Sequence, residues 1–164
     1  MKIKLYITGG TIDARYNLLK AKVDYDRSHI DDMLEQARSR VEIDLEQLTL
    51  KDSGDINDED RQQILEKCKM ADTDKIIITH GTDTMVQAAE LLGGAGLTDK
   101  TIVLVGAMIP FVFKGSDALF NLGAAVTAVQ LLGNGVYLAM NGRVFNWDNV
   151  QKNFDIGEFQ EKHS

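Results

Sequence analysis

The stretch Ile76-Ile77-Ile78-Thr79-His80-Gly81-Thr82-Asp83-Thr84-Met85 indicates the fold most directly. It opens with four β-branched residues, the composition of a strand buried on both faces of a parallel sheet. It then breaks at a glycine and continues with helical spacing, with hydroxyl and carboxylate side chains at the turn. Ligands bind at this point of an open α/β sheet, just beyond the carboxyl end of a strand. We therefore expect residues 79–85 to form part of a site.

Two further turns have the same character. Thr8-Gly9-Gly10-Thr11 follows an alternating strand at 2–8, and Lys51-Asp52-Ser53-Gly54-Asp55 follows a second alternating strand at 41–50. Each turn combines a hydroxyl side chain with glycine. Because the carboxyl ends of parallel strands lie along one edge of a sheet, the sequence predicts that all three turns form one active site.

The remaining pattern predicts a doubly wound α/β fold. Apolar runs predict four more strands, at 75–79, 101–107, 135–140 and 144–145. Helical spacing predicts four helices, beginning near Ser28, Asn57, Thr84 and Ser116-Asp117. This alternation gives a parallel sheet in a three-layer α/β/α sandwich of the flavodoxin or Rossmann type, with residues 1–164 as a single domain.

Three segments between these elements are interpreted from composition. Residues 12–27 have no clean period and are expected to form a loop. The helix capped by Ser28 is expected to run to Val41, with apolar residues at helical spacing. Gly93-Gly94-Ala95-Gly96 follows a helix rather than a strand, so it is expected to end that helix rather than to bind phosphate. Lys152 lies in a polar tail.

Composition excludes several classes of partner. The 164 residues include 18 basic and 25 acidic ones, for a net charge of -7 without a basic stripe, so nucleic acid is a poor partner. No apolar run approaches the length of a membrane span. Met1 leads directly into a strand without a signal-like apolar region, so we expect a cytoplasmic protein. The single Cys68 lies at helical spacing among apolar residues and is expected to be a core thiol.

Threonine and serine hydroxyls are the candidate reactive groups. Thr11 follows two glycines, which allow backbone N–H groups to approach a substrate oxygen closely, although an ordinary tight turn has the same composition. Thr82 and Asp83 are also common helix caps, but one capping residue suffices and several are present here. Ser53 lies in a cluster that is equally typical of a simple turn. Composition does not distinguish Lys152 from other lysines.

Metal and nucleotide motifs are absent from the sequence. The three histidines (His29, His80 and His163) are far apart, and the single cysteine has no partner. No Gly-x-Gly-x-x-Gly or Walker-type loop is present. We therefore expect no metal and no cofactor.

Two motifs resemble those of the bacterial-type asparaginase/glutaminase family: Thr8-Gly9-Gly10-Thr11-Ile12 and Thr79-His80-Gly81-Thr82-Asp83-Thr84-Met85. The resemblance continues through Ser53–Asn57 and Val105–Pro110, then through Ser116–Leu122, and ends between Met140 and Lys152. It covers nearly the whole chain, but only the larger, N-terminal domain of the family.

The resemblance implies a role for each matched residue. Thr11 is the nucleophile, while Thr82, Asp83 and Lys152 form a second hydrogen-bonded set that activates a hydroxyl or a water molecule. Ser53 with Gly54 holds the substrate carboxylate, and Asp83 with Gly81 and Thr82 lines the same substrate site. The family also pairs a lid tyrosine with the nucleophile. Both Tyr16 and Tyr25 are candidates, with a slight preference for Tyr16 in the loop next to Thr11.

The chain departs from the family in three ways. Asp13 stands where a small residue is usual, Ile109 stands where arginine is usual, and the smaller C-terminal domain has no counterpart in the 164 residues. In the family, that domain completes the active site of a neighbouring subunit. We also expect self-association as a homodimer, because a lone domain of this family would expose apolar surface.

The leading hypothesis is a single-domain asparaginase-like amidohydrolase that acts on the side-chain amide of L-asparagine or a related small amide. A second hypothesis is an amino-acid sensor without catalysis, or a subunit that requires a separate C-terminal partner. A flavodoxin-like nucleotide-binding protein is a third, and it predicts a coloured or nucleotide-loaded preparation.

Overall fold

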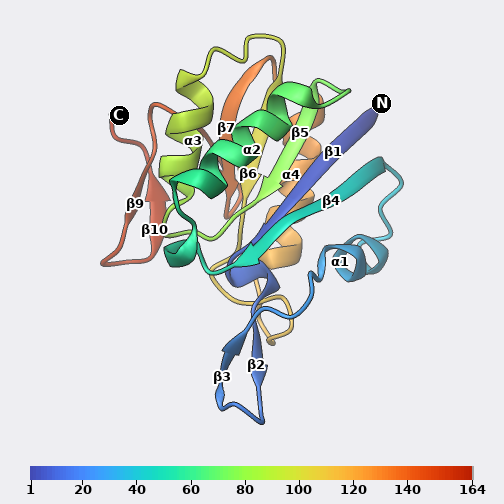
Figure 1. Cartoon of the computed structure of the whole chain (residues 1–164), viewed down its shortest axis with the longest axis vertical. Coiled ribbons are helices and arrows are strands. Elements are labelled where there is room, and N and C mark those ends of the chain that lie inside the picture. The colour runs from blue at the N-terminus through green and yellow to red at the C-terminus, as the bar shows by residue number, and fades with distance from the viewer. Residues whose placement is uncertain (164) are drawn as a thin grey trace.

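The computed structural model describes residues 1–163 and confirms an α/β fold around a mostly parallel six-stranded sheet (Figure 1). In spatial order the strands are β4 (Glu42–Lys51), β1 (Lys2–Gly9), β5 (Lys75–Thr79), β6 (Thr101–Val105), β7 (Gly135–Met140) and β8 (Arg143–Asn146). The first five are parallel. The predicted short sixth strand is present as β8, but it pairs antiparallel to β7 because a two-residue turn joins them.

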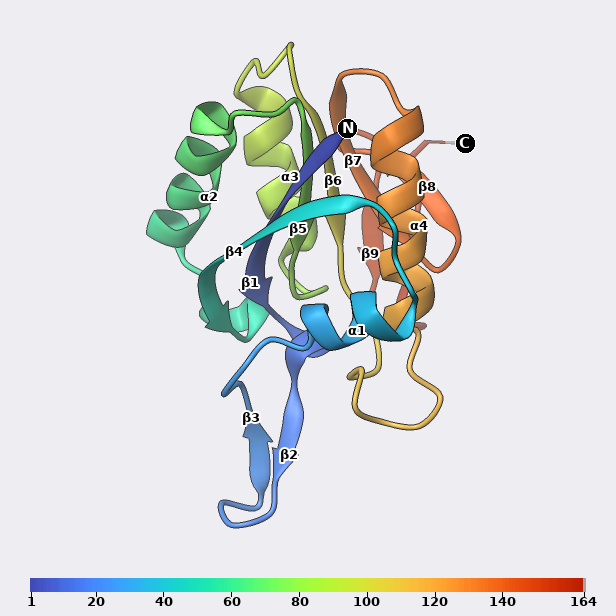
Figure 2. The ribbon, with the colours of Figure 1, turned by 90° about the vertical axis from the view of Figure 1, so that its right-hand side faces the viewer.

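Helices cover both faces of the sheet. Figure 2 shows the sheet edge-on, with α2 (Asp58–Met70) and α3 (Met85–Gly94) on one side and α1 (Ile30–Gln36) and α4 (Ala118–Leu131) on the other. This is the predicted three-layer sandwich. No helix within residues 1–163 combines the length and the hydropathy that crossing a membrane requires.

The strand at 75–79 separates two hydrophobic cores. Successive side chains of a strand point to opposite faces, so Ile76 and Ile78 pack in the core beneath α2 and α3, and Ile77 packs in the core beneath α1 and α4. All three side chains are fully buried. Burial on both faces explains why this strand has no polar residue between Lys75 and Thr79. Cys68 is buried in the first core, as predicted.

The predicted loop at 12–27 is wrong in part, because it contains a two-stranded hairpin. The strands β2 (Arg15–Asn17) and β3 (Lys22–Asp24) pair antiparallel, and the hairpin projects beyond the body of the molecule (Figure 1). Asn17 builds its turn: the side-chain oxygen accepts hydrogen bonds from Leu19 N and Lys20 N, and its amide donates to Asp24. The tail around Lys152 is also a hairpin, formed by β9 (Gln151–Asn153) and β10 (Glu158–Gln160).

The prediction for the first helix is close at its start and wrong at its end. Helix α1 begins at Ile30, whose N–H donates to the Ser28 hydroxyl at 3.2 Å, and the His29 side chain in the N-cap position makes no capping bond. It ends at Gln36 because Arg38 adopts a left-handed conformation (φ 54°), and the Ser39 N–H then donates to Leu34 O, which closes the helix in a Schellman motif. The predicted cap at Asn57 is confirmed: Asn57 and Asp60 form a reciprocal capping box at the start of α2.

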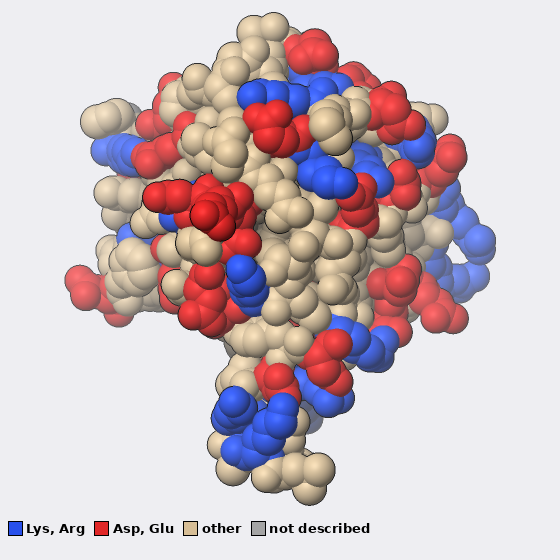
Figure 3. All heavy atoms as spheres, in the orientation of Figure 1, with Lys and Arg blue, Asp and Glu red and all other residues tan. Residues whose placement is uncertain are grey.

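The surface over α2, α3 and β4 carries both signs of charge, interspersed (Figure 3). A group of basic side chains covers the projecting hairpin, which includes Arg15, Lys20 and Lys22. Its tip is apolar, with Leu18 and Leu19 almost fully exposed.

Candidate active site

The three glycine-containing turns lie against one another at the carboxyl ends of β1, β4 and β5. Gly10 N donates to Lys51 O at 2.8 Å, which joins the first turn to the second. A Cβ atom on Gly10 would overlap the backbone of Gly81, and a Cβ atom on Gly81 would overlap the side chain of Ser53. The Thr84 hydroxyl donates to Ser53 O at 2.8 Å. Glycine is therefore required at both positions, because only a residue without a side chain allows the turns to approach this closely.

Lys152 reaches these turns from the β9–β10 hairpin, outside the main sheet. Its ammonium donates to Thr82 Oγ1 at 2.8 Å and lies 2.5 Å from Asp83 Oδ1. The Lys152 side chain is 7% exposed and that of Asp83 is 59% exposed, so the carboxylate reaches toward solvent while the ammonium is covered. The ring of Phe154 lies 5.1 Å from the ammonium nitrogen.

Neither Thr82 nor Asp83 caps helix α3. Thr84 occupies the N-cap position, and its hydroxyl is bonded to Ser53 O. The side chains of Thr82 and Asp83 are instead directed to Lys152. The capping interpretation of these two residues is therefore wrong.

In the turn after β4, the neighbouring residues Asp52 and Ser53 have different roles. Asp52 caps the short 3-10 turn Ser53–Asp55 by accepting a hydrogen bond from Gly54 N at 2.9 Å. Ser53 is buried, and its hydroxyl makes no hydrogen bond with any residue in 1–163. The turn does not use the Ser53 hydroxyl, which leaves this group available to a ligand.

Thr11 begins a 3-10 turn, Thr11–Asp13, immediately after the two glycines. Gly9 (φ 97°) and Gly10 (φ 81°) both adopt conformations that a residue with a Cβ atom avoids. The Thr11 side chain is half-buried, and within the described chain its hydroxyl has no hydrogen-bond partner. The Thr11 hydroxyl is therefore not used to stabilise the turn that contains it.

The two candidate tyrosines differ in surroundings. Tyr16, on β2, is 50% exposed, and its hydroxyl makes no hydrogen bond within residues 1–163. The Tyr25 hydroxyl donates to Asp52 Oδ2 at 2.7 Å, beside the Ser53 turn. Burial raises the pKa of Tyr25 well above 10, and the bond to Asp52 adds to the shift, as does the charge of Asp83. Within residues 1–163, the hydroxyl of Tyr25 is therefore bonded to one of the three turns and that of Tyr16 is not, while the sequence slightly favours Tyr16.

Asp13 is a positioning residue that sequence reasoning noted only as a departure. It is fully buried, and its Oδ1 accepts hydrogen bonds from the Ser28 hydroxyl (2.9 Å) and His29 N (2.7 Å). These bonds join the two ends of the segment that contains the β2–β3 hairpin and Tyr25. The second oxygen, Oδ2, is buried without a partner within the described chain, and burial raises the pKa of Asp13.

His80 lies beneath the central turn and is fully buried. Its Nδ1 lies 2.8 Å from Gly81 O, and its backbone N–H donates to Val105 O. Burial lowers the pKa of His80, which favours the neutral ring. His80 thus stabilises the turn by contacts with Gly81 and Val105 rather than by facing a ligand. In residues 1–163, no group of three or more His, Cys, Asp or Glu side chains is arranged to hold a metal ion.

Comparison with known proteins identifies the family. Residues 2–156 match the family model Asparaginase, N-terminal. The chain is 34% identical to the Haemophilus influenzae protein named Probable L-asparaginase periplasmic, over 92% of this chain and 46% of that protein. It therefore spans about half the length of the curated relatives it matches.

Solved structures give the same result. The L-asparaginase of Thermococcus kodakarensis superposes with a TM-score of 0.83 at 28% identity, covering 98% of this chain and 51% of that one. The Campylobacter jejuni protein named Probable Cytoplasmic L-asparaginase gives a TM-score of 0.80 at 30% identity, with the same coverage. Because these names include both compartments, the cytoplasmic location of this chain stays a prediction. The chain belongs to the asparaginase family and corresponds to its N-terminal domain.

Proposed function

We propose that this chain is an amidohydrolase that releases ammonia from the side-chain amide of L-asparagine or a related small amide. The observation that carries the proposal is the contact of the Lys152 ammonium with the Thr82 hydroxyl and the Asp83 carboxylate, across a sequence separation of 70 residues. A lysine beside a hydroxyl and a carboxylate is suited to proton transfer, because its amine in the neutral form can accept the hydroxyl proton and later return it.

Thr11 is the proposed nucleophile. Its hydroxyl oxygen forms a bond to the amide carbon, and its proton passes to a neighbouring base and then to the leaving nitrogen. The C–N bond breaks and ammonia leaves, which produces an ester between Thr11 and the substrate acyl group. Water activated by the Thr82, Asp83 and Lys152 set then hydrolyses this ester and restores the Thr11 hydroxyl. Backbone N–H groups of the glycine turns stabilise the oxyanion in both steps.

The remaining groups orient the substrate. The Ser53 hydroxyl, which has no partner within residues 1–163, supports a role in holding a carboxylate, and the exposed Asp83 carboxylate supports a role in holding an ammonium group. The Gly54 N–H already donates to Asp52 Oδ1, so it does not supply a second free donor. An α-amino acid carries both charges, which supports a small amino-acid substrate. We assign the lid tyrosine to Tyr25 because of its bond to Asp52.

The test is ammonia release from L-asparagine by the purified chain, beside Thr11→Ala and Thr8→Ala. Thr8 is a matched control because its hydroxyl is buried and donates to Thr79 O. We expect loss of turnover in Thr11→Ala only. Undiminished turnover in Thr11→Ala would overturn the assignment of the nucleophile.

A second candidate function is favoured by the unpartnered Ser53 hydroxyl and the exposed Asp83 carboxylate, which can bind an amino acid whether or not a reaction follows. Such a domain is suited to act as an amino-acid sensor without catalysis, or as one part of an active site that another polypeptide completes. Thermal stabilisation by aspartate without ammonia release would support this alternative. Stabilisation together with ammonia release supports the enzyme.

A further inference from the structure

The ammonium group of Lys152 has three N–H donors, and the described chain supplies oxygen partners for two of them. Thr82 Oγ1 accepts one bond at 2.8 Å, and Asp83 Oδ1 accepts another. Within residues 1–163, no third oxygen accepts a bond from this ammonium group. Instead, the nitrogen lies over the ring of Phe154, 5.1 Å from the ring centroid. An aromatic ring is therefore the third close partner of the lysine.

The exposed fractions of the two residues show how they are arranged. The Lys152 side chain is 7% exposed, whereas Phe154 is 67% exposed. A ring that contacts a covered ammonium group and is itself open to solvent lies between that group and the water. Phe154 therefore covers Lys152 on the side away from Thr82.

The β9–β10 hairpin fixes the ring relative to the lysine. Phe159, the cross-strand partner of Lys152, is buried in the core beneath α2 and α3 and anchors the hairpin there. At the turn, Asn153 Oδ1 accepts a hydrogen bond from Asp155 N at 3.0 Å, which holds the backbone on both sides of Phe154. Residues two apart on a strand point to the same side, so Phe154, directly after β9, lies beside Lys152.

Two physical effects of the ring bear on the reaction. The face of an aromatic ring is electron-rich and attracts a cation, more strongly where water is excluded. The ring also has no oxygen or nitrogen atom that could exchange a proton with the lysine. Without the ring, a water molecule would reach the third N–H and compete with Thr82 for the proton. With the ring in place, the described partners for proton exchange at Lys152 are Thr82 and Asp83.

We propose that Phe154 is a positioning residue for Lys152: its ring holds the ammonium group against Thr82 and Asp83 and keeps water away from it. The effect of Phe154 on the rate of ammonia release rests on the proposed amidohydrolase function. Its effect on the accessibility of Lys152 does not, so the two effects can be tested separately.

The first test measures the accessibility of Lys152 without using activity. The purified chain is treated with trinitrobenzenesulfonate, which modifies accessible amines, and each lysine is followed by mass spectrometry of peptides. Lys20, whose side chain is 59% exposed, is the reference in the same molecule. We expect Lys152 to react more slowly than Lys20 in the wild type, and about twofold or more faster in Phe154→Ala than in the wild type.

The matched control for the hairpin turn is Ile156→Ala. Ile156 lies in the same turn as Phe154 and is similarly exposed, at 61%. This variant should modify Lys152 at the wild-type rate, because the ring over the ammonium group is retained. Circular dichroism checks that each variant is folded.

The second test measures the kinetics of ammonia release from L-asparagine. Phe154→Ala should lower kcat by about two- to thirtyfold and leave KM nearly unchanged, because the ring acts on Lys152 rather than on the substrate. Phe154→Tyr keeps the aromatic ring and should keep kcat near the wild-type value. A structural defect of the hairpin would not be restored by tyrosine in this way.

Equal rates of Lys152 modification in the wild type and Phe154→Ala overturn the positioning role, whether or not the chain releases ammonia. A rise in KM at constant kcat also overturns it, because the ring would then contact the substrate. The same holds if Phe154→Tyr is as slow as Phe154→Ala. A wild type that releases no ammonia while Phe154 shields Lys152 overturns the proposed function and supports the positioning role.

Discussion

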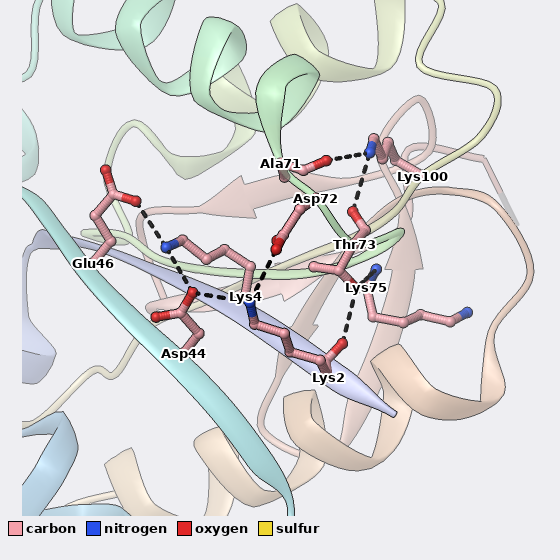
Figure 4. A network of polar contacts seen from close by, with 9 residues as sticks. All are labelled: Lys2, Lys4, Asp44, Glu46, Ala71, Asp72, Thr73, Lys75 and Lys100. Carbon is pink, nitrogen blue, oxygen red and sulfur yellow. Dashed lines mark hydrogen bonds and ion pairs between the residues drawn. The ribbon is translucent and has the colours of Figure 1, made fainter.

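The two ends of the parallel strands differ in the surroundings of their lysines. At the amino end, Lys2 and Lys4 pair with Asp72, Asp44 and Glu46, as Figure 4 shows. Lys100, which is buried there, donates to Ala71 O at 2.9 Å and Thr73 O at 3.1 Å. These ammonium groups join backbone segments and surface carboxylates to one another. Lysine side chains therefore connect the segments at the amino end of the sheet.

At the carboxyl end, Lys152 contacts the hydroxyl and the carboxylate of two adjacent residues in one turn, Thr82 and Asp83. In the neighbouring turns, the Thr11 and Ser53 hydroxyls have no partner within residues 1–163. A polar group that the protein leaves unpaired is available to water or to a ligand. The difference indicates that the two ends of the strands have different roles. Lysines at the amino end pair with carboxylates and carbonyl groups and stabilise the fold, whereas hydroxyl groups at the carboxyl end stay available to a ligand.

The largest expected effects come from replacing one lysine at each end of the strands, Lys152 and Lys100. Lys152→Met should lower ammonia release by at least about a hundredfold, because proton transfer at Thr82 is lost. Lys100→Met should instead lower the free energy of unfolding by about 1–3 kcal/mol, because two buried carbonyl groups lose their donor. Urea denaturation and an ammonia assay on both variants measure this. Retained activity in Lys152→Met would contradict the division between the two ends.

The tyrosines sharpen the comparison within the carboxyl end. Tyr25→Phe removes the hydroxyl bonded to Asp52 and should lower kcat by about tenfold or more. Tyr16→Phe should leave kcat nearly unchanged, because that hydroxyl faces solvent. Steady-state kinetics on both variants decide which tyrosine serves the site. A larger loss in Tyr16→Phe would return the assignment to the residue nearer to Thr11.

The carboxylates offer a third, smaller contrast. Asp13→Ala leaves Ser28 and His29 N without an acceptor and should cost about 1–3 kcal/mol of stability. It should also loosen the hairpin segment, so that trypsin cleaves faster at Lys20 and Lys22. Asp44→Ala, at the amino end, removes a half-exposed carboxylate and should change little, because Lys4 keeps its pair with Glu46 and Lys2 keeps its pair with Asp72. Equal trypsin sensitivity in the two variants would show that Asp13 does not hold the hairpin.

The smallest expected effect concerns pH. Burial lowers the pKa of His80 below 6.5 in the folded protein, so the unfolded chain binds the proton first as the pH falls. The contribution of His80 to the free energy of unfolding is therefore fully present above pH 6.5. It decreases below that pH, by at most about 1.4 kcal/mol per pH unit. Urea denaturation of His80→Gln at pH 7.5 and 5.5 should show a smaller loss than the wild type. The exposed His163→Gln serves as the control, and should behave as the wild type.

Much of the fold could be predicted because its signals are local. The buried run at 76–78 and the box of Asn57 and Asp60 specify their elements within a few residues. The β2–β3 hairpin escaped prediction because no glycine or proline marks its turn, and the side chain of Asn17 organises it instead. The end of α1 was missed because Arg38, rather than glycine, adopts the left-handed conformation.

Some residues of the candidate site could also be predicted from local sequence, and others could not. The glycines next to Thr11 and Thr82 are visible in the sequence because close contact between turns requires them. Lys152 could be selected only through a family resemblance, since it reaches Thr82 across 70 residues and from another sheet. The choice between Tyr16 and Tyr25 depends on how the hairpin folds back, which no local pattern specifies.

The position of Lys152 on a hairpin after β8 has a consequence for synthesis. All six strands of the main sheet precede this lysine in the chain, so a nascent domain can assemble its sheet while the site still lacks its ammonium group. The last strand, β8, ends at Asn146, six residues before Lys152. At about 5–20 residues per second, the ribosome covers those six residues in roughly 0.3–1.2 s. The sheet is therefore fully translated about a second or less before the lysine that supplies the ammonium group.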